Sequence, residues 1–222
     1  MVYITGDCHG EAARLSRGAL RLKKGDTLIV CGDFGFLWEG GRQEEKFLQK
    51  LGRRPYHICF IDGRHENYAL LGNFPVSEFA GGRAQVISGN VVHLLRGELY
   101  TFEGETYFAF GGGESDDYDC RDEAQTWWPE EMPSEEELRR GLAVLEAAGQ
   151  RVDYIVTHEP SGKACGRLLG RKNPGALQLY FNRIEDTVSF KRWFFGCLHL
   201  DRDLTARHRA LYREVIPVNR DK

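Results

Sequence analysis

The sequence predicts an α/β fold in which parallel strands are covered by helices. In the first part of the chain, short apolar runs alternate with amphipathic segments, and β-α-β units of this kind build parallel sheets. Five apolar runs are each followed at once by a loop that carries Asp, His or another polar residue. The 222 residues, of which 41% are hydrophobic, suffice for one packed core, so we expect a single domain over residues 1–222.

The N-terminal part of the chain predicts the order β-α-β-α-β. Short apolar strands are expected over 2–5, 27–31 and 56–61, and each is followed by a Gly-Asp or Asp-Gly pair. Apolar residues that recur at helical spacing predict helices over 11–22 and 42–51.

The middle of the chain changes character. Three short strands at hairpin spacing are expected over 91–95, 98–102 and 106–110, and their short connections are typical of an antiparallel meander. Ser134 is followed three residues later by Glu137, which is the pattern of a capping box and predicts the start of a helix.

The last part returns to alternating strands and helices. The helix is expected to end at Gly149, because glycine is the residue that most easily adopts the left-handed conformation at helix ends. Further strands are expected over 153–157, 193–195 and 210–218, with a helix over 175–186 between the first two.

Composition and charge exclude several classes of protein. Lys and Arg number 30 and Asp and Glu 33, and the net charge of −3 is unlike that of a polybasic nucleic-acid binder or an acidic disordered chain. No apolar run approaches the ~20 residues that span a bilayer, and the first residues lack the features of a signal peptide. The six cysteines form no C-x-x-C pair. We therefore expect a cytoplasmic protein with reduced thiols and no membrane partner, while nucleic acid stays open as a substrate.

The polar residues that follow the strands are expected to gather at one edge of the sheet, because sites in α/β folds collect at the carboxyl ends of strands. Carboxylates and imidazoles are ligands suited to Zn²⁺, Mn²⁺ or Fe²⁺, and a carboxylate can bridge two cations. The residues expected there are Asp7, His9, Asp33, His65, His158 and His199.

Five motifs in order carry a resemblance to a known family. They are Asp7-Cys8-His9, Gly32-Asp33-Phe34-Gly35, Gly63-Arg64-His65-Glu66, Thr157-His158-Glu159-Pro160 and Gly196-Cys197-Leu198-His199. With these motifs the chain resembles the calcineurin-like metallophosphoesterases over nearly its whole length. The Gly111-Gly112 loop, Arg121 and Trp127-Trp128-Pro129 resemble a small bacterial or phage branch of that family.

The resemblance implies a fold, an activity and a cofactor. The fold is a four-layer sandwich of two mixed β-sheets flanked by helices. The activity is hydrolysis of phosphate mono- or diesters, in which a metal-bound hydroxide attacks phosphorus. The implied cofactor is a divalent metal, Mn, Zn or Fe, and the implied partner is a phosphoester substrate.

The resemblance also implies roles for single residues. Asp7, His9 and His199 would hold the first metal. Asp33 would bridge the two metals, and His158 would be a ligand of the second metal. His65 would act at the leaving group as general acid or transition-state stabiliser, and Glu66 would orient it.

Two positions depart from the family pattern, and both belong to the second metal. Arg64 stands where the family has Asn, and arginine offers no acceptor to a cation and repels it. Cys197 stands where the family has His, and a cysteine ligand would be a thiolate that prefers zinc.

Three interpretations of these departures stay open. In the first, the site holds one metal tightly, and Arg64 supplies the positive charge that a second metal would have given. In the second, Arg64 turns outward and leaves a weakened second metal site that can include Cys197. Alternatively catalysis is weak or lost, and the chain is a pseudophosphatase that serves as a phosphate- or nucleotide-binding or interaction module. The sequence names neither the substrate nor the oligomeric state.

Overall fold

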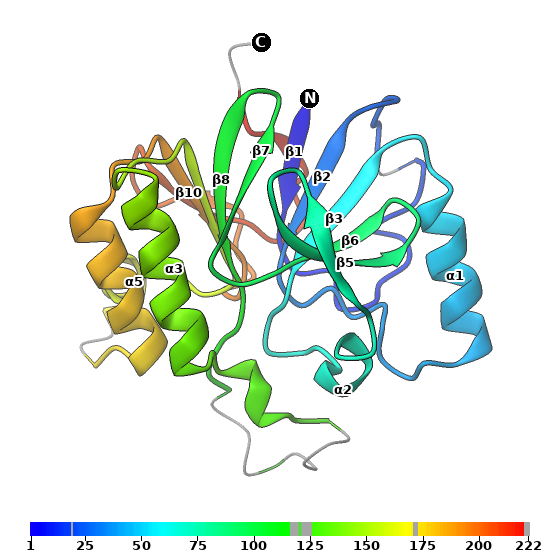
Figure 1. The fold of residues 1–222 in the computed structure, drawn as a ribbon, viewed down its shortest axis with the longest axis horizontal. Helices are drawn as coiled ribbons and strands as arrows, with labels where there is room; N and C mark the ends of the chain where they lie inside the picture. The colour runs from blue at the N-terminus through cyan, green and yellow to red at the C-terminus, as the bar shows by residue number, and fades with distance from the viewer. Residues whose placement is uncertain (19, 116–119, 121–125, 171–172, 220–222) are drawn as a thin grey trace.

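Two β-sheets packed face to face, with helices on both outer faces, form the fold (Figure 1). The computed structural model describes residues 1–222 except 19, 116–119, 121–125, 171–172 and 220–222. Within these residues the first sheet has seven strands, in the order β13 (Ile216–Pro217), β1 (Val2–Thr5), β2 (Thr27–Cys31), β3 (His57–Ile61), β6 (Val91–Leu94), β5 (Gly82–Ser88) and β4 (Val76–Phe79). The second has six, in the order β11 (Arg202–Asp203), β12 (His208–Ala210), β10 (Arg192–Phe195), β9 (Tyr154–Thr157), β8 (Glu105–Phe110) and β7 (Glu98–Phe102).

Both sheets are mixed, and their central strands are parallel. The strands β1, β2, β3 and β6 run parallel to one another, as do β8, β9, β10 and β12. The helices are α1 (Arg42–Gly52), α2 (Tyr68–Leu71), α3 (Glu135–Ala147), α4 (Gly162–Leu169) and α5 (Ala176–Thr187), with a 3₁₀ turn η2 at Pro129–Glu131. The expected α/β sandwich of two mixed sheets flanked by helices is therefore confirmed.

Side-chain alternation along the strands explains the continuous apolar runs. On β2, Ile29 packs into the core between the sheets, whereas Leu28 and Val30 pack outward against the layer of α1. Both faces of the strand are thus buried, as is usual for parallel strands covered by helices. On the opposite side of the molecule, Ile155 and Phe181 join β9 to α5 in a third apolar cluster.

In the segment over 11–22, expected to be a helix, the described residues 11–18 and 20–22 contain turns but no helix. Its backbone hydrogen bonds join Arg14 to Glu11, Ser16 to Ala13 and Leu20 to Ser16. Leu15 and Leu20 are both buried in the outer cluster, so the apolar residues reach the core without a helix. The helical expectation was therefore wrong, because apolar spacing reports burial and not the backbone conformation that achieves it.

The expected meander divides between the two sheets. Strand β6 pairs with β3 and β5 in the first sheet, whereas β7 and β8 pair in the second. The chain changes sheet at Arg96-Gly97, where Arg96 is buried and Gly97 has a φ of 72° and packs closely against Gly141. The hairpin of β4 and β5 and the helix α4 were not expected.

The C-terminal expectation needs a similar correction, while two helix boundaries are confirmed. Of the single strand expected over 210–218, only Ala210, the last residue of β12, and β13 are strand residues, and these two strands belong to different sheets. Ser134 and Glu137 form the capping box at the start of α3, and Gly149 beyond its end has a φ of 66°. Among the described residues no helix is long and apolar enough to cross a membrane. Arg121 lies outside the described residues.

Candidate metal centre

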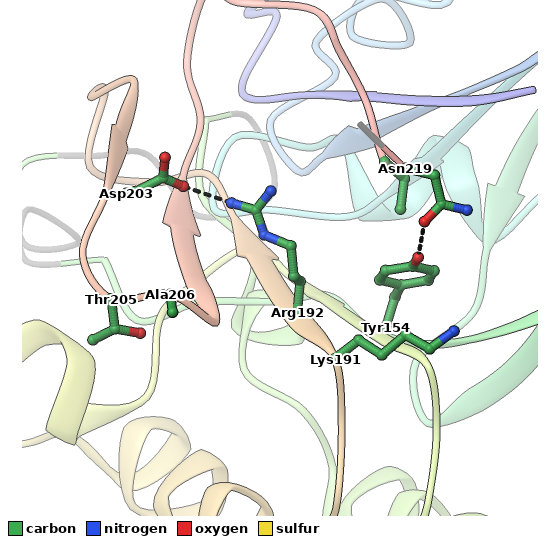
Figure 2. Close-up of a pocket in the computed structure, with 8 residues that line it drawn as sticks. Tyr154, Lys191, Arg192, Asp203, Thr205, Ala206 and Asn219 are labelled. Atoms are coloured by element: carbon green, nitrogen blue, oxygen red, sulfur yellow. Dashed lines mark hydrogen bonds and ion pairs between the residues drawn. The ribbon is translucent and has the colours of Figure 1, made fainter. Parts of the chain in front are cut away.

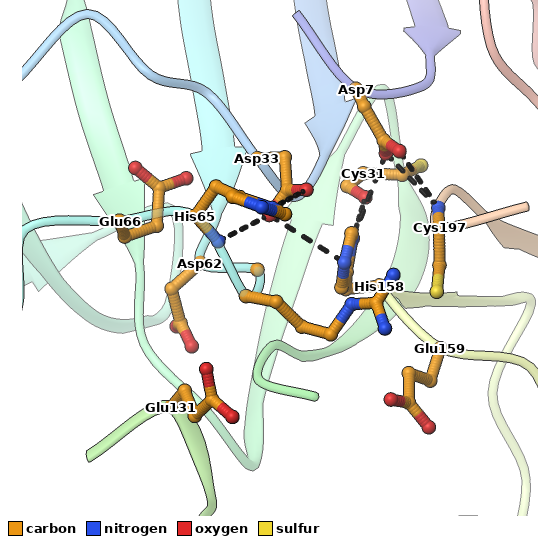
Figure 3. A network of polar contacts seen from close by, with 12 residues as sticks. Asp7, Cys31, Asp33, Asp62, His65, Glu66, Glu131, His158, Glu159 and Cys197 are labelled. Atoms are coloured by element: carbon orange, nitrogen blue, oxygen red, sulfur yellow. Dashed lines mark hydrogen bonds and ion pairs between the residues drawn. The ribbon is translucent and has the colours of Figure 1, made fainter. Parts of the chain in front are cut away.

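The carboxyl ends of strands from both sheets meet at one place. Asp7 and Asp33 follow β1 and β2 in the first sheet, whereas His158 follows β9 in the second. Figure 3 shows His65 and His158 on either side of Asp33, with Asp7 and Cys197 beyond His158. Both aspartates and His158 are buried, so the site lies partly between the two sheets.

Two glycines make room for the carboxylates. A Cβ atom at Gly63 would lie 2.1 Å from Asp33 Oδ1, and one at Gly196 would lie 2.0 Å from Asp7 Oδ1. Real side chains do not tolerate such contacts, so only glycine lets the neighbouring loops close over the two aspartates.

Asp7, His9 and His199 form the more exposed part of the site. His199 Nε2 lies 3.1 Å from Asp7 Oδ2 and 2.9 Å from His9 Nε2. The hydrogen bond to Asp7 raises the pKa of His199, whereas partial burial lowers the pKa of His9. Each residue offers one donor atom, and the three atoms lie within 4.8 Å of one another, which suits the coordination of one cation.

Asp7, Asp33 and His158 form a second group that is fully buried. His158 Nδ1 lies 3.6 Å from Asp7 Oδ1, and its Nε2 lies 3.6 Å from Asp33 Oδ1. Burial opposes the charged form of His158, but the two carboxylates outweigh it and raise its pKa well above the usual value. The pKa of Asp33 is lowered despite its burial, because His158 and His65 face its carboxylate.

His158 provides the test of whether a cation fits this site. Its Nδ1 is 3.0 Å from Cys31 O, to which it donates, so the lone pair of the neutral ring lies on Nε2. Nε2 is buried and has no hydrogen-bond partner among the described residues. A buried nitrogen that lacks a partner and faces carboxylates fits a divalent metal, and metal-ligating histidines commonly use their second nitrogen in this way.

His65 contacts the far side of Asp33. Its backbone N donates to Asp33 Oδ1 at 2.8 Å, and its ring Nδ1 lies 2.9 Å from Asp33 Oδ2. Glu66, expected to orient His65, accepts hydrogen bonds from the backbone N–H groups of Phe34 and Gly35. Glu66 thus secures the loop that carries Asp33, and Asp33 itself contacts the His65 ring.

Arg64 and Cys197 line the same pocket. Its volume is about 240 Å³, and it also includes Glu114 and the buried Glu159. The Arg64 stem packs over Gly113, and its Nη1 donates to Glu114 O at 3.3 Å. Cys197 donates its backbone N–H to the Asp7 carboxylate. Its thiol belongs to none of the groups of potential ligands found within the described part of the chain.

Four residues of the site have left-handed backbone conformations. His9, Asp33, Cys197 and His199 have φ values of 47°, 46°, 62° and 50°. Non-glycine residues adopt this region at a cost, and such strain concentrates where a fold must direct side chains to one point.

Two contacts of the site had no signal in the sequence. The Tyr212 ring stacks on His199 with ring centroids 4.4 Å apart and an interplanar angle of 18°. Arg14 donates to Asp7 O at 2.7 Å, and its guanidinium lies 5.5 Å from the Tyr212 ring. Both residues lie in loops without a motif, and only the fold brings them to the site.

A larger pocket of about 530 Å³ lies elsewhere (Figure 2). Tyr154 and Arg192, which line it, stand at the amino ends of β9 and β10, whereas the metal-ligand candidates follow the carboxyl ends. Arg192 is paired with Asp203, and Tyr154 with Asn219. This pocket is therefore not part of the candidate metal centre.

Known proteins that are similar to this chain include one solved structure, a putative 5'-nucleotidase from Staphylococcus aureus in complex with alpha-ketoglutarate. It is 11% identical, with a TM-score of 0.45; the match covers 96% of this chain but 48% of that one, so the chain spans about half its length. No curated protein matches the chain. The family described as calcineurin-like phosphoesterase matches residues 1–201, and on this match the chain belongs to the calcineurin-like phosphoesterase family.

Proposed function

We propose that the chain is a metal-dependent hydrolase of phosphate mono- or diesters. The observation that carries the proposal is the convergence of two buried carboxylates and four imidazoles from five separate loops. Oxygen and nitrogen donors in this combination suit Mn²⁺, Zn²⁺ or Fe²⁺. Membership of the family supports the same class of chemistry.

The proposed cofactor is one tightly held divalent cation. Asp7, His9 and His199 would hold it, with Asp33 beside them, whereas Asp33 and His158 remain for a weaker second cation. The bound cation would lower the pKa of a water and polarise a phosphoryl oxygen. The donor groups within 4.8 Å of one another support this assignment.

Arg64 and His65 act on the phosphate and the leaving group in this proposal. Arg64 supplies fixed positive charge and two parallel N–H donors for phosphate oxygens, in place of a second cation. His65 would donate a proton to the leaving oxygen, and the Asp33 carboxylate, 2.9 Å from its Nδ1, would hold the ring in position. Glu66 contributes through the backbone of the Asp33 loop.

A second candidate function is a phosphate- or nucleotide-binding pseudophosphatase. It is favoured by one observation, namely that Arg64 and Cys197 both line the pocket beside His158. A cation near His158 would then face a guanidinium instead of an amide oxygen. In that case the site binds phosphate through Arg64 without hydrolysis.

Turnover of an aryl phosphodiester and an aryl phosphomonoester tests the two candidates. The metal-free protein is supplied with Mn²⁺, Zn²⁺ or Fe²⁺ in turn. The wild type is expected to hydrolyse at least one ester, and Asp33→Asn is expected to lower kcat/KM by at least about 100-fold, the scale of losing one charge-stabilising group. Asp186→Asn is the matched control, since Asp186 is an exposed carboxylate on α5 paired with Lys163.

The outcomes of these assays distinguish the hydrolase from the pseudophosphatase. A wild type that is inert with every metal, together with a gain of turnover in the double variant Arg64→Asn and Cys197→His, supports the pseudophosphatase. Equal activity of the wild type and Asp33→Asn contradicts both the assignment of the site and the hydrolase. We also propose a cytoplasmic location, which the absence of disulfides among the six free cysteines supports.

A further inference from the structure

A buried arginine outside the metal centre connects the two backbone segments that flank Arg64. Arg96 lies in the turn between β6 and β7 and is only 5% exposed. Its Nε donates to Asp62 Oδ2 at 2.7 Å. Its Nη2 donates to the backbone carbonyls of Glu130 at 2.8 Å and Glu131 at 3.1 Å. One guanidinium therefore serves a side chain on one segment and carbonyls on another.

The first of these segments leads directly to His65. Asp62 follows β3 directly and precedes Gly63-Arg64-His65, and its Oδ1 is 3.1 Å from His93 Nε2. The Tyr68 hydroxyl accepts from Arg96 Nη2 at 3.0 Å and donates to Gly63 O at 2.6 Å. The backbone that leads into the loop of Arg64 and His65 is thus held through the Asp62 side chain and through the Gly63 carbonyl.

The second segment lies against Arg64. Gly113 donates its N–H to Glu131 O at 3.0 Å, and the Glu131 carboxylate accepts from Ser115 N and Oγ. Gly113 contacts the Arg64 stem, and Glu114 O accepts from Arg64 Nη1. Asp62 lies between His65 and Glu131 in Figure 3. Arg96 thus reaches Arg64 through each of the two segments.

Electrostatics support a single arrangement of this network. Burial disfavours the charged Asp62, but Arg96 and His93 outweigh burial and hold the pKa of its carboxyl well below the usual range. An ion pair that is buried, hydrogen-bonded and forked fixes geometry more firmly than an exposed pair, because each group loses much if the other moves.

We propose that Arg96 is a positioning residue for phosphoester hydrolysis. Through Asp62 and Tyr68 it fixes the backbone that carries Arg64 and His65. Through the carbonyls of Glu130 and Glu131 it fixes the segment on which Arg64 rests. The inference rests on the proposed hydrolase function, since it concerns how Arg64 and His65 meet the phosphate.

Two conservative variants test the proposal with a matched control. Tyr68→Phe removes the hydroxyl that joins Arg96 to Gly63. Arg96→Lys keeps the positive charge but loses the planar guanidinium that donates to several partners at once. Both are expected to lower kcat about tenfold, because sub-ångström misplacement of a catalytic group costs on that scale. KM and Mn²⁺ affinity are expected to change less than about twofold, since neither residue contacts the metal-ligand candidates. Arg83→Lys, which alters an arginine on β5 that is paired with Glu98 on β7, is expected to leave kcat unchanged.

A spectroscopic readout makes the test independent of turnover. The Nε–H signal of Arg64, assigned by its loss in Arg64→Lys, is expected to shift in Tyr68→Phe and in Arg96→Lys but not in Arg83→Lys. In a double-mutant cycle, Arg96→Lys is expected to cost less in the Arg64→Asn background than in the wild type.

The failure of this inference differs from the failure of the proposed function. An inactive wild type overturns the hydrolase, while the Arg64 signal still tests the positioning. An active wild type with unchanged kcat and an unshifted Arg64 signal in both variants overturns the role of Arg96. A fall in kcat that follows a loss of thermal stability, with Arg64 unshifted, overturns it as well.

Discussion

Adding one methyl group at Gly63 is expected to disable the site without unfolding the chain. The Cβ of Gly63→Ala would lie 2.1 Å from Asp33 Oδ1 and 2.4 Å from Asp33 N, whereas ordinary contacts begin at 3.4 Å. The Asp33 carboxylate or the His65 loop must therefore move by about 1 Å, and misplacement on that scale costs about 100-fold in rate. The same strain is expected to lower the free energy of unfolding by about 1–3 kcal/mol.

The assay measures kcat/KM for an aryl phosphoester, Mn²⁺ affinity by calorimetry, and thermal unfolding. Gly18→Ala is the matched control, because a Cβ there meets nothing within 4 Å. We expect a loss of about 100-fold in kcat/KM and weaker Mn²⁺ binding for Gly63→Ala, with a cooperative unfolding transition retained. Wild-type activity in Gly63→Ala would refute the claim that Asp33 must lie where the structure has it.

Three further predictions concern residues around the site. Tyr212→Leu removes the ring stacked on His199 and is expected to weaken Mn²⁺ binding about tenfold by calorimetry, whereas unchanged affinity would show that the stack does not orient His199. Asp62 has a folded-state pKa below its unfolded value of about 3.9, so its contribution to stability is present above that pH and lost as the pH falls. In urea titrations from pH 7 to 3 the stability gap between the wild type and Asp62→Asn should therefore narrow with acid, and a constant gap would contradict this. Burial raises the pKa of the Cys8 thiol to about 12, so iodoacetamide at pH 8 should modify the exposed Cys120 and leave Cys8 of the folded protein unmodified.

The sequence predicted that the residues of the candidate site would lie together because of a rule about strand ends. Asp7, Asp33 and His158 each follow an apolar run, and parallel strands bring such positions to one edge. What local patterns cannot give is the pairing between strands: 91–95 and 98–102 look like neighbours in one hairpin, yet they lie in different sheets. The burial and the contacts of Arg96 at that turn could not be predicted for the same reason, because its partners Asp62 and Glu131 are distant in the chain.

The sequence also did not predict the local structure at places where polar side chains hydrogen-bond to backbone groups. Residues 11–22 have helical spacing, yet the described residues 11–18 and 20–22 form no helix, and the Arg14 guanidinium donates to the carbonyl of Asp7. Glu66 was expected to orient His65, and its carboxylate accepts hydrogen bonds from the backbone N–H groups of Phe34 and Gly35, which no pattern in the sequence indicated. Both cases depend on which backbone group lies nearby in space, and spacing along the chain does not contain that information.

Metal stoichiometry tests the central claim most directly. Metal-free wild type is titrated with Mn²⁺, Zn²⁺ and Fe²⁺ under identical conditions, and bound metal per chain is measured by calorimetry and elemental analysis. The account predicts one tight cation, lost in Asp7→Asn, and a second tight cation only after Arg64→Asn is combined with Cys197→His. Two equally tight cations in the wild type, or tight binding that survives Asp7→Asn, would contradict it.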